Sequence, residues 1–457
     1  MPRSILDLFV TVLILLLYFN AGARADDPSQ EELRYLSSAM PLIQTRAWSD
    51  AEAKLNDGLK RFPHSAILTN ALGIVYERED RRDDAIHAFE RALEWLPSFT
   101  AAQIHLASLY AATGKCDRAI GLFSAAVQNT SDAGALEAAG IGLGQCKDYA
   151  DAVHVLEKLR TLNPASSAAL FDLALAHYKN AEFQAALHDL ESLPSGPGHE
   201  RPDVLFLRGK ILQALKRPGS AASLSGACQA QPEEDYCDDA AIELLREEHF
   251  LEAADLLQNS AGRMHASVTL LTTLGLAQFR LGRYHDAIAT YSKALQIDPK
   301  LDAPREGLGF LLYMTGDLER ARSVVEQGLD RPEADFYLPY LRALILYRTS
   351  RQLWHDALAS LTRALQRNPK FAPSYFLRGK IQFEENNLDA ALVDFQTAAR
   401  LDPKYPLPYY KMAQIFLREG KRNAAEEAQR RFAALGNLRE EEMLAKQTQD
   451  LLMPAER

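Results

Sequence analysis

Alanine recurs along this chain at a nearly constant spacing of about 34 residues. The series runs through most of the chain: Ala51, Ala85, Ala119, Ala152, Ala186, Ala221, Ala253, Ala287, Ala321, Ala357, Ala391 and Ala425. A constant period of this length is typical of a solenoid, in which copies of one short unit stack in a row. At 457 residues the chain would otherwise suggest about three globular domains. The unbroken period favours one elongated array instead.

Each repeating unit has the pattern of two amphipathic helices. In the second unit Leu72, Gly73 and Tyr76 lie on one helix, and Ala85 and Phe89 lie on a second. Proline stands where the second helix must end, because it cannot continue a helix. These prolines are Pro97, Pro299, Pro369 and Pro403. Glycine, a usual C-terminal cap, stands at the expected turn between the paired helices. These glycines are Gly114, Gly282, Gly316 and Gly420.

The same landmarks return in later units. The eighth unit, for example, has Leu274, Gly275, Ala287, Tyr291 and Pro299. This pattern resembles the tetratricopeptide repeat, which reads W-x2-L-G-x2-Y, then A-x3-F, then P. The resemblance covers about residues 32–437. It implies an all-α fold, a right-handed superhelical solenoid of about twelve helix-turn-helix repeats.

Two irregularities and the chain ends set the expected organisation. Residues 193–198, which read Leu-Pro-Ser-Gly-Pro-Gly, interrupt the fifth repeat, and about three extra residues lie near 349–351 in the tenth. We therefore expect an N-terminal array of about five repeats over residues 26–200 and a C-terminal array of about seven over 201–437. Residues 438–457 are polar and begin with a helical pattern. They predict a capping helix and tail, which a solenoid needs over its last exposed face.

Residues 1–25 have the layout of a secretory signal peptide. An apolar run from Leu8 to Phe19 is followed by Ala23-Arg24-Ala25, a small-residue cleavage site. The run is short for a membrane span, and no later stretch is apolar enough to provide one. The sequence therefore predicts export, with the protein periplasmic or secreted. The alternative is an uncleaved segment that anchors the protein in the membrane by its N-terminus.

The exported part contains four cysteines: Cys116, Cys146, Cys228 and Cys237. An oxidising compartment permits disulfides. Cys116 and Cys146 fall at equivalent turns of neighbouring repeats, and Cys228 and Cys237 flank a short link between two helices, so we favour these two pairings. The alternative is four buried thiols in slots for small side chains. A metal site is disfavoured because no C-x2-C spacing occurs.

Composition and motifs give no sign of catalysis or of nucleic-acid binding. The formal net charge is −10, whereas nucleic-acid binding needs basic surface. Gly140, Gly142 and Gly144 resemble a phosphate loop, but they lie inside an expected helix, where such a loop does not occur. No H-E-x-x-H or G-x-S-x-G motif is present. We therefore expect no enzyme, no cofactor and no metal.

The resemblance also implies where a partner binds. In tetratricopeptide arrays the first helix of each pair lines a concave face that takes a peptide or a partner helix. In the C-terminal half this chain is expected to place aromatic and cationic residues there. They are Arg280, Phe310, Tyr313, Tyr340, Tyr347, Arg348, Phe376, Lys380, Phe383, Tyr410 and Arg418. Aromatic and arginine side chains dominate binding hot spots. The alternative is that many of these rings pack between helices.

Three hypotheses for function follow. The first is an exported scaffold that holds a peptide or protein segment in its C-terminal concave groove. The second is a structural component of a cell-envelope or secretion assembly that contacts its partners through the convex face or the repeat ends. The third is an enzyme or carrier hidden in the array, which would hold a metal or cofactor. We favour the first.

Overall fold

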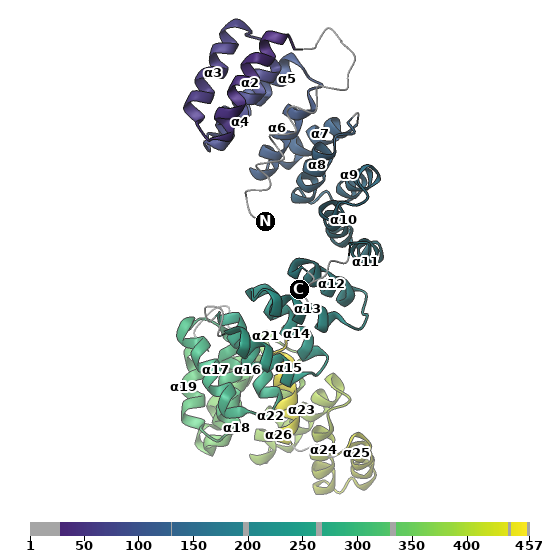
Figure 1. Ribbon diagram of the computed structural model, residues 1–457. Helices are drawn as coiled ribbons and strands as arrows, with labels where there is room; N and C mark the ends of the chain where they lie inside the picture. Colours follow the sequence, from purple (N-terminus) through teal and green to yellow (C-terminus); the bar gives the residue numbers. More distant parts are fainter. Residues whose placement is uncertain are drawn as a thin grey trace. The chain divides into compact units, whose positions relative to one another are not determined.

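The computed structural model describes residues 28–128, 130–194, 201–261, 267–329, 335–436 and 440–454. Within these ranges the chain forms 25 α-helices and one short 3-10 turn, and it forms no strand (Figure 1). The first 24 helices make twelve consecutive pairs, as the alanine period predicts, so the fold is an all-α repeat solenoid. The predicted signal peptide, residues 1–25, lies outside the described residues.

The chain divides into two compact units, each described by itself below. The first contains residues up to 200 together with 207–218, and the second contains 201–206 and everything from 219 onward. The helices of the first unit are α2 (Gln30–Gln44), α3 (Trp48–Arg61), α4 (Ala66–Arg78), α5 (Arg82–Trp95), α6 (Thr100–Ala112), α7 (Cys116–Val127), α8 (Ala133–Gln145), α9 (Tyr149–Leu162), α10 (Ser167–Lys179) and α11 (Phe183–Glu191). Helix α12 (Pro202–Ala214) contributes residues to both units.

The second unit contains the longer run of pairs and one additional helix. Its helices are α13 (Ser220–Ala230), α14 (Glu234–Arg246), α15 (Phe250–Ala261), α16 (Val268–Arg280), α17 (Tyr284–Ile297), α18 (Asp302–Met314), α19 (Leu318–Leu329), α20 (Tyr337–Thr349), α21 (Trp354–Arg367), α22 (Ala372–Glu384), α23 (Leu388–Leu401), α24 (Pro406–Arg418), α25 (Arg422–Leu435) and α26 (Glu440–Leu451). The unpaired helix, α26, follows the twelfth pair.

Small residues set the distance between the helices of a pair. Every alanine of the periodic series lies on the second helix of its pair, and all are at most 4% exposed. Opposite them, a side chain on Gly73 would put its Cβ 2.5 Å from the ring of Phe89, and one on Gly275 would lie 2.5 Å from the ring of Tyr291. Since no Cβ fits at such distances, these glycines are required for the aromatic rings to fill the core.

The turn inside almost every pair contains one residue in the left-handed region. At the four predicted glycines φ lies between 73° and 85°. At seven other turns the residue is not glycine, although φ is still positive. These are Arg46, Asp80, Lys147, Ala181, Lys216, Glu248 and Asn386, with φ between 52° and 64°. The conformation persists because the next amide closes the helix, as where Arg81 N–H donates to the Tyr76 carbonyl at 2.9 Å.

The tenth repeat departs from this turn in the way that its extra residues predict. Helix α20 ends at Thr349, Ser350 is extended with φ at −163°, and residues Arg351–Leu353 form the 3-10 turn before α21 begins. The predicted prolines lie just after second helices, as expected. Helices α5, α17, α21 and α23 each end two residues before one of them.

Candidate functional site

The first helices of the last four repeats place equivalent residues in one stripe. Each contributes three residues at i, i+4 and i+7, which share a helix face. The set, named here the groove stripe, is Glu306, Phe310 and Tyr313 of α18; Tyr340, Leu344 and Tyr347 of α20; Phe376, Lys380 and Phe383 of α22; and Tyr410, Gln414 and Leu417 of α24. The offsets between helices are those of the alanine period.

Burial along the stripe falls abruptly at α24. The stripe side chains of α18 are at most 7% exposed, and the α22 rings of Phe376 and Phe383 are 3% and 8% exposed. In contrast, Tyr410 is 44% exposed and Leu417 is 54% exposed. Some element therefore covers the stripe over α18, α20 and α22 and leaves its α24 end open.

The covering element is the C-terminal helix α26, drawn in yellow in Figure 1. It packs against α16 and α18, although it lies far from them in the sequence. Its buried residues are Met443, Leu444 and Thr448. Leu444 joins the apolar cluster that contains Phe310, and Met443 joins the one that contains Phe376. The groove stripe is thus filled by an amphipathic helix of the chain itself.

Polar contacts fix α26 at its N-terminal end. The Nζ of Lys380 donates to both carboxylate oxygens of Glu440, at 2.8 and 3.1 Å. The side chain of Lys380 is 14% exposed and that of Glu440 is 37% exposed, so the cation of this ion pair is more sheltered from water than its carboxylate. The same Nζ lies 4.8 Å from the centre of the Tyr347 ring. A cation that is both paired and stacked on a ring binds more strongly than an exposed one.

A second group of polar contacts fixes the C-terminal end of α26. Arg280 pairs with Asp450 at 3.0 Å, and Gln449 Nε2 donates to the Phe279 carbonyl at 3.3 Å. Thr448 Oγ1 is hydrogen-bonded to the phenol of Tyr337, whose pKa is raised because it is buried. The helix therefore runs with its N-terminus at α22 and its C-terminus at α16.

The buried phenols of the stripe stay uncharged at ordinary pH. Burial is the first cause that raises the pKa of Tyr313, Tyr340 and Tyr347, and nearby carboxylates such as Glu440 raise it further. Glu306, at the α18 end, is 7% exposed, and its Oε1 has no hydrogen-bond partner among the residues that the structure describes. Burial, followed by the charge of Asp335, raises the pKa of Glu306 to about 8.

At the open end, two cations stack on one ring. The guanidinium of Arg418 lies 4.3 Å from the centre of the Phe383 ring, and the Nζ of Lys411 lies 4.9 Å from it. Within the part of the chain that the structure describes, neither makes an ion pair. The pKa of Lys411 is lowered, first by burial and then by the charge of Lys380. Glu384 and Glu440 act on Lys411 in the opposite sense, but among the described residues no carboxylate forms an ion pair with either cation at this end of the groove.

The structure brings the predicted groove residues into one unit, in three different environments. Buried against other helices are Phe310, Tyr313, Tyr340, Phe376 and Phe383. Paired with α26 are Arg280 and Lys380. Partly or fully open to solvent are Tyr347, Arg348, Tyr410 and Arg418. Tyr347 stacks on Trp354, and Arg348 donates to the Tyr313 carbonyl at 3.0 Å.

Sequence reasoning missed the other half of this site. It assigned Glu306 no role, although Glu306 stands one repeat before Tyr340 and two repeats before Phe376. It also predicted residues 438–457 as a terminal cap and gave no contacts for them. The acidic first turn of α26, Glu440 to Glu442, combined with apolar Met443 and Leu444, is the available signal for a helix that binds a cationic, aromatic groove.

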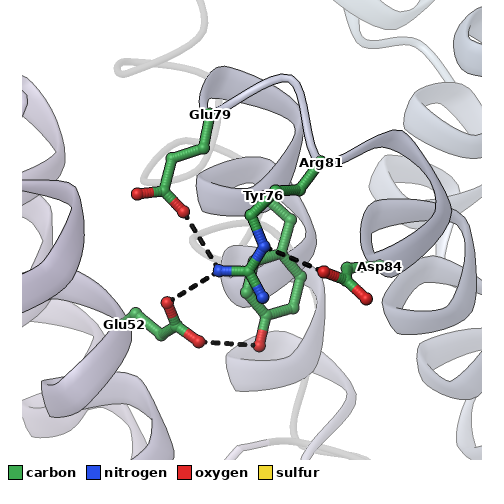
Figure 2. A network of polar contacts seen from close by, with 5 residues as sticks. All are labelled: Glu52, Tyr76, Glu79, Arg81 and Asp84. Atoms are coloured by element: carbon green, nitrogen blue, oxygen red, sulfur yellow. Dashed lines mark hydrogen bonds and ion pairs between the residues drawn. The ribbon is translucent and has the colours of Figure 1, made fainter.

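In the first unit a polar network surrounds Arg81 (Figure 2). Its guanidinium lies 4.1 Å from the centre of the Tyr76 ring and pairs with Glu52 at 3.0 Å, Glu79 at 3.2 Å and Asp84 at 2.8 Å. The Tyr76 phenol donates to Glu52 at 3.1 Å. Because Glu52 belongs to the first repeat and Arg81 to the second, this network joins neighbouring repeats.

Both predicted cysteine pairings are confirmed. Cys116 is bridged to Cys146 in the first unit, and Cys228 is bridged to Cys237 in the second. The first bridge joins the start of α7 to the end of α8, which is the junction of two repeats. As for membrane insertion, none of the described helices combines the length and the apolar character needed to cross a bilayer.

Comparison with protein families identifies the repeats. A model described as "TPR repeat" matches residues 275–316 and 379–420, and one described as "Tetratricopeptide repeat" matches 42–94, 70–134 and 147–200. Together these segments cover about half of the chain. The chain belongs to the tetratricopeptide-repeat family. Repeats of this family form scaffolds for protein–protein interaction, so the groove stripe belongs to a protein-binding fold.

Individual relatives are distant. The human protein O-mannosyl-transferase TMTC1 is 27% identical over 157 residues, which are 33% of this chain and 18% of that protein. The Drosophila melanogaster BBSome complex member BBS4 homolog is 24% identical over 266 residues, 57% of this chain and 54% of that protein. This chain thus spans about half or less of the length of these curated relatives.

Solved structures share the repeat fold at low identity. The APC/C hetero-tetramer Cut9-Hcn1 has a TM-score of 0.42 and 16% identity, and the match covers 92% of this chain and 83% of that one. PilW, a type IV pilus biogenesis factor, has a TM-score of 0.39 and 19% identity, over 46% of this chain and 98% of that one. These likenesses concern the fold alone.

Proposed function

We propose that this protein is an exported, non-catalytic scaffold that holds a segment of a partner protein in the groove of its second unit. The observation that supports the proposal is the fit between the groove stripe and α26. The stripe accepts an amphipathic helix and buries its apolar side. Lys380 of the stripe and Arg280 of α16 pair with charges at the two ends of that helix. A surface that binds one such helix has the shape and chemistry to bind another.

The residue types of the groove favour recognition. Tyrosine and arginine are enriched at binding hot spots because each buries a large area and offers a polar group, and phenylalanine adds apolar area at interface cores. Here the buried phenols are neutral, and cations stack on rings at Tyr313, Tyr347 and Phe383. The groove therefore selects a helix that is apolar on one side and acidic at its ends.

Export is part of the proposal and rests on two features. Residues 1–25 have the layout of a signal peptide, and the two disulfides suit an oxidising compartment. N-terminal sequencing of the protein purified from its natural host tests this. A first residue of Asp26 and four oxidised cysteines are expected. An intact Met1 in the membrane fraction would favour the anchored alternative, and reduced cysteines in an intact chain would contradict export.

The groove assignment is tested by charge reversal and crosslinking. We would compare wild type with the double variant Lys380→Glu, Arg418→Glu, after circular dichroism shows that the variant is folded. The matched control is Lys293→Glu, an exposed lysine on the second helix of its pair. A partner crosslinked to wild type and to the control, but not to the double variant, is expected. If the same partners crosslink to all three, the contact lies on the convex face or the repeat ends.

A further inference from the structure

Helix α26 leaves part of its own binding surface unused. Over α18 to α22 most of the groove stripe is buried, with Tyr347 and Lys380 partly exposed, but at α24 Tyr410 and Leu417 are 44% and 54% exposed. These residues continue the same stripe, each one repeat beyond its equivalent on α22. The open end is thus a direct continuation of an interface that the chain already forms with a helix.

The charges at this open end have a defined sign. Lys411 and Arg418 stack on Phe383 and form no ion pair among the described residues. They face the end of α26 that contains Glu440, Glu441 and Glu442, since Glu440 is bound by Lys380 on the neighbouring first helix, α22. In a chain with a formal net charge of −10, this is a local cationic site. Its complement is an acidic segment.

The direction of α26 determines how a longer helix would lie. Its C-terminus is held at α16 and its N-terminus at α22, so a helix extended beyond its N-terminus runs toward α24. Neighbouring packed helices lie about 10 Å apart. At about 1.5 Å per residue, two added turns, or about seven residues, span that distance. Acidic residues in those turns would meet Lys411 and Arg418.

We propose that the partner segment is an acidic amphipathic helix about two turns longer than α26, which binds first at the open α24 end and then displaces α26. This inference rests on the proposed function and specifies its ligand. In it, α26 is a built-in competitor that keeps the groove closed to shorter or less acidic segments. The partner gains what α26 lacks, which is contact with Leu417, Lys411 and Arg418.

Competition has a measurable consequence. When only the fraction of molecules with a vacant groove can bind, the apparent dissociation constant is the intrinsic one divided by that fraction. Any change that loosens α26 without altering the groove must therefore tighten binding of an added helix. A change in α26 that leaves its buried side intact must not.

Two fluorescent peptides and the full-length protein test the proposal. The short probe is residues 438–454 of this chain. The long probe adds two helical turns before them, with Glu and Leu at helical spacing. By fluorescence anisotropy, wild type is expected to bind the long probe at least about tenfold more tightly than the short one. Changing Lys411 and Arg418 together to Ala should weaken the long probe about tenfold and the short probe less than about twofold.

The competitor role is tested in the same assay. Leu444→Ala removes most of a buried side chain of α26 and should tighten both probes at least about tenfold. Lys446→Ala, an exposed position of the same helix, should change neither. Equal binding of the two probes, or no effect of Leu444→Ala, would overturn the inference. So would a wild-type dimer that the long probe dissociates, because the occupant would then be α26 of a second copy.

The results separate this inference from the proposed function. Suppose that the two probes bind equally, or that Leu444→Ala has no effect, but the double variant Lys380→Glu, Arg418→Glu still loses a crosslinked partner. The groove then binds a protein segment of another kind. If the probes behave as expected but no partner depends on the groove, the acidic-helix site exists and the scaffold acts through another surface.

Discussion

Replacing Leu444 by alanine should detach α26 from the groove without unfolding the repeats. Leu444 is 5% exposed and belongs to the largest apolar cluster of the second unit. The substitution removes three buried carbons, at about 0.8 kcal/mol each, and leaves a small cavity. The expected loss is about 2–3 kcal/mol. Because none of the described repeats stacks upon α26, this loss falls on its docking.

Hydrogen exchange measured by mass spectrometry reports the detachment directly. A loss of about 2–3 kcal/mol raises the detached population roughly 30- to 150-fold, since each 1.4 kcal/mol is a factor of about ten. Amides of residues 440–451 should exchange faster by that factor when exchange proceeds through detachment. Amides of α4 in the first unit should not change. Lys446→Ala is the control, because it keeps a good helix former at an exposed position of the same helix.

Two results would refute this reasoning. If α26 exchanges at the same rate in wild type and in Leu444→Ala, its burial does not hold it in the groove. If the helices of the second unit lose protection together with α26, the helix is an integral part of the core, and docking cannot be separated from folding.

Three further predictions concern stability. Ala181→Gly should increase the free energy of unfolding of the first unit by about 0.5–1 kcal/mol, because Ala181 has φ at 61°, which glycine adopts without strain. Its melting temperature should therefore rise, and an unchanged or lower melting temperature in a calorimetric scan would contradict the prediction. Burial raises the pKa of Glu306 to about 8 from an ordinary 4.5. Between these two pH values the folded protein keeps the proton and the unfolded chain has lost it. The free energy of unfolding should therefore fall by up to about 1.4 kcal/mol per pH unit as the pH rises from about 4.5 to about 8. Glu306→Gln should flatten that slope in urea titrations, and an unaltered slope would count against it. Replacing Cys116 and Cys146 together by Ala should cost about 3–4 kcal/mol, since their sequence separation is 30; urea midpoints that match oxidised wild type would exclude that stabilisation.

The fold could be predicted from the sequence because the residues that determine it act locally and recur in every repeat. Each buried alanine, such as Ala85 or Ala287, must sit where two helices meet closely, and the same requirement returns in every repeat. The prolines that follow the second helices and the disulfide pairings were predictable for the same reason. Once the period is known, equivalent turns in neighbouring repeats are close in space, as the Cys116–Cys146 bridge illustrates.

The turns inside the pairs could be predicted only in part from the preferences of single residues. Four left-handed turn residues are glycines and could be predicted. Two others, Asp80 and Asn386, are of types that tolerate that conformation, but five, among them Ala181 and Glu248, have side chains that disfavour it. Packing of the paired helices imposes the turn, and the gain in packing exceeds the local cost of about 1–2 kcal/mol. At these turns no local preference of the residue predicts the left-handed conformation.

The state of the groove was decided only by the tertiary structure. The sequence by itself determined twelve helix pairs, their core alanines and the residue types on the first helices, because periodicity fixes which side of a helix each residue occupies. It did not determine that Phe310, Phe376 and Phe383 are buried, because the packing of several helices decides this. Nor did it determine that Lys380 is paired, because its partner Glu440 lies on α26, outside the repeats and further along the chain. Contacts between distant segments depend on the complementarity of two folded surfaces, and no repeat period encodes them.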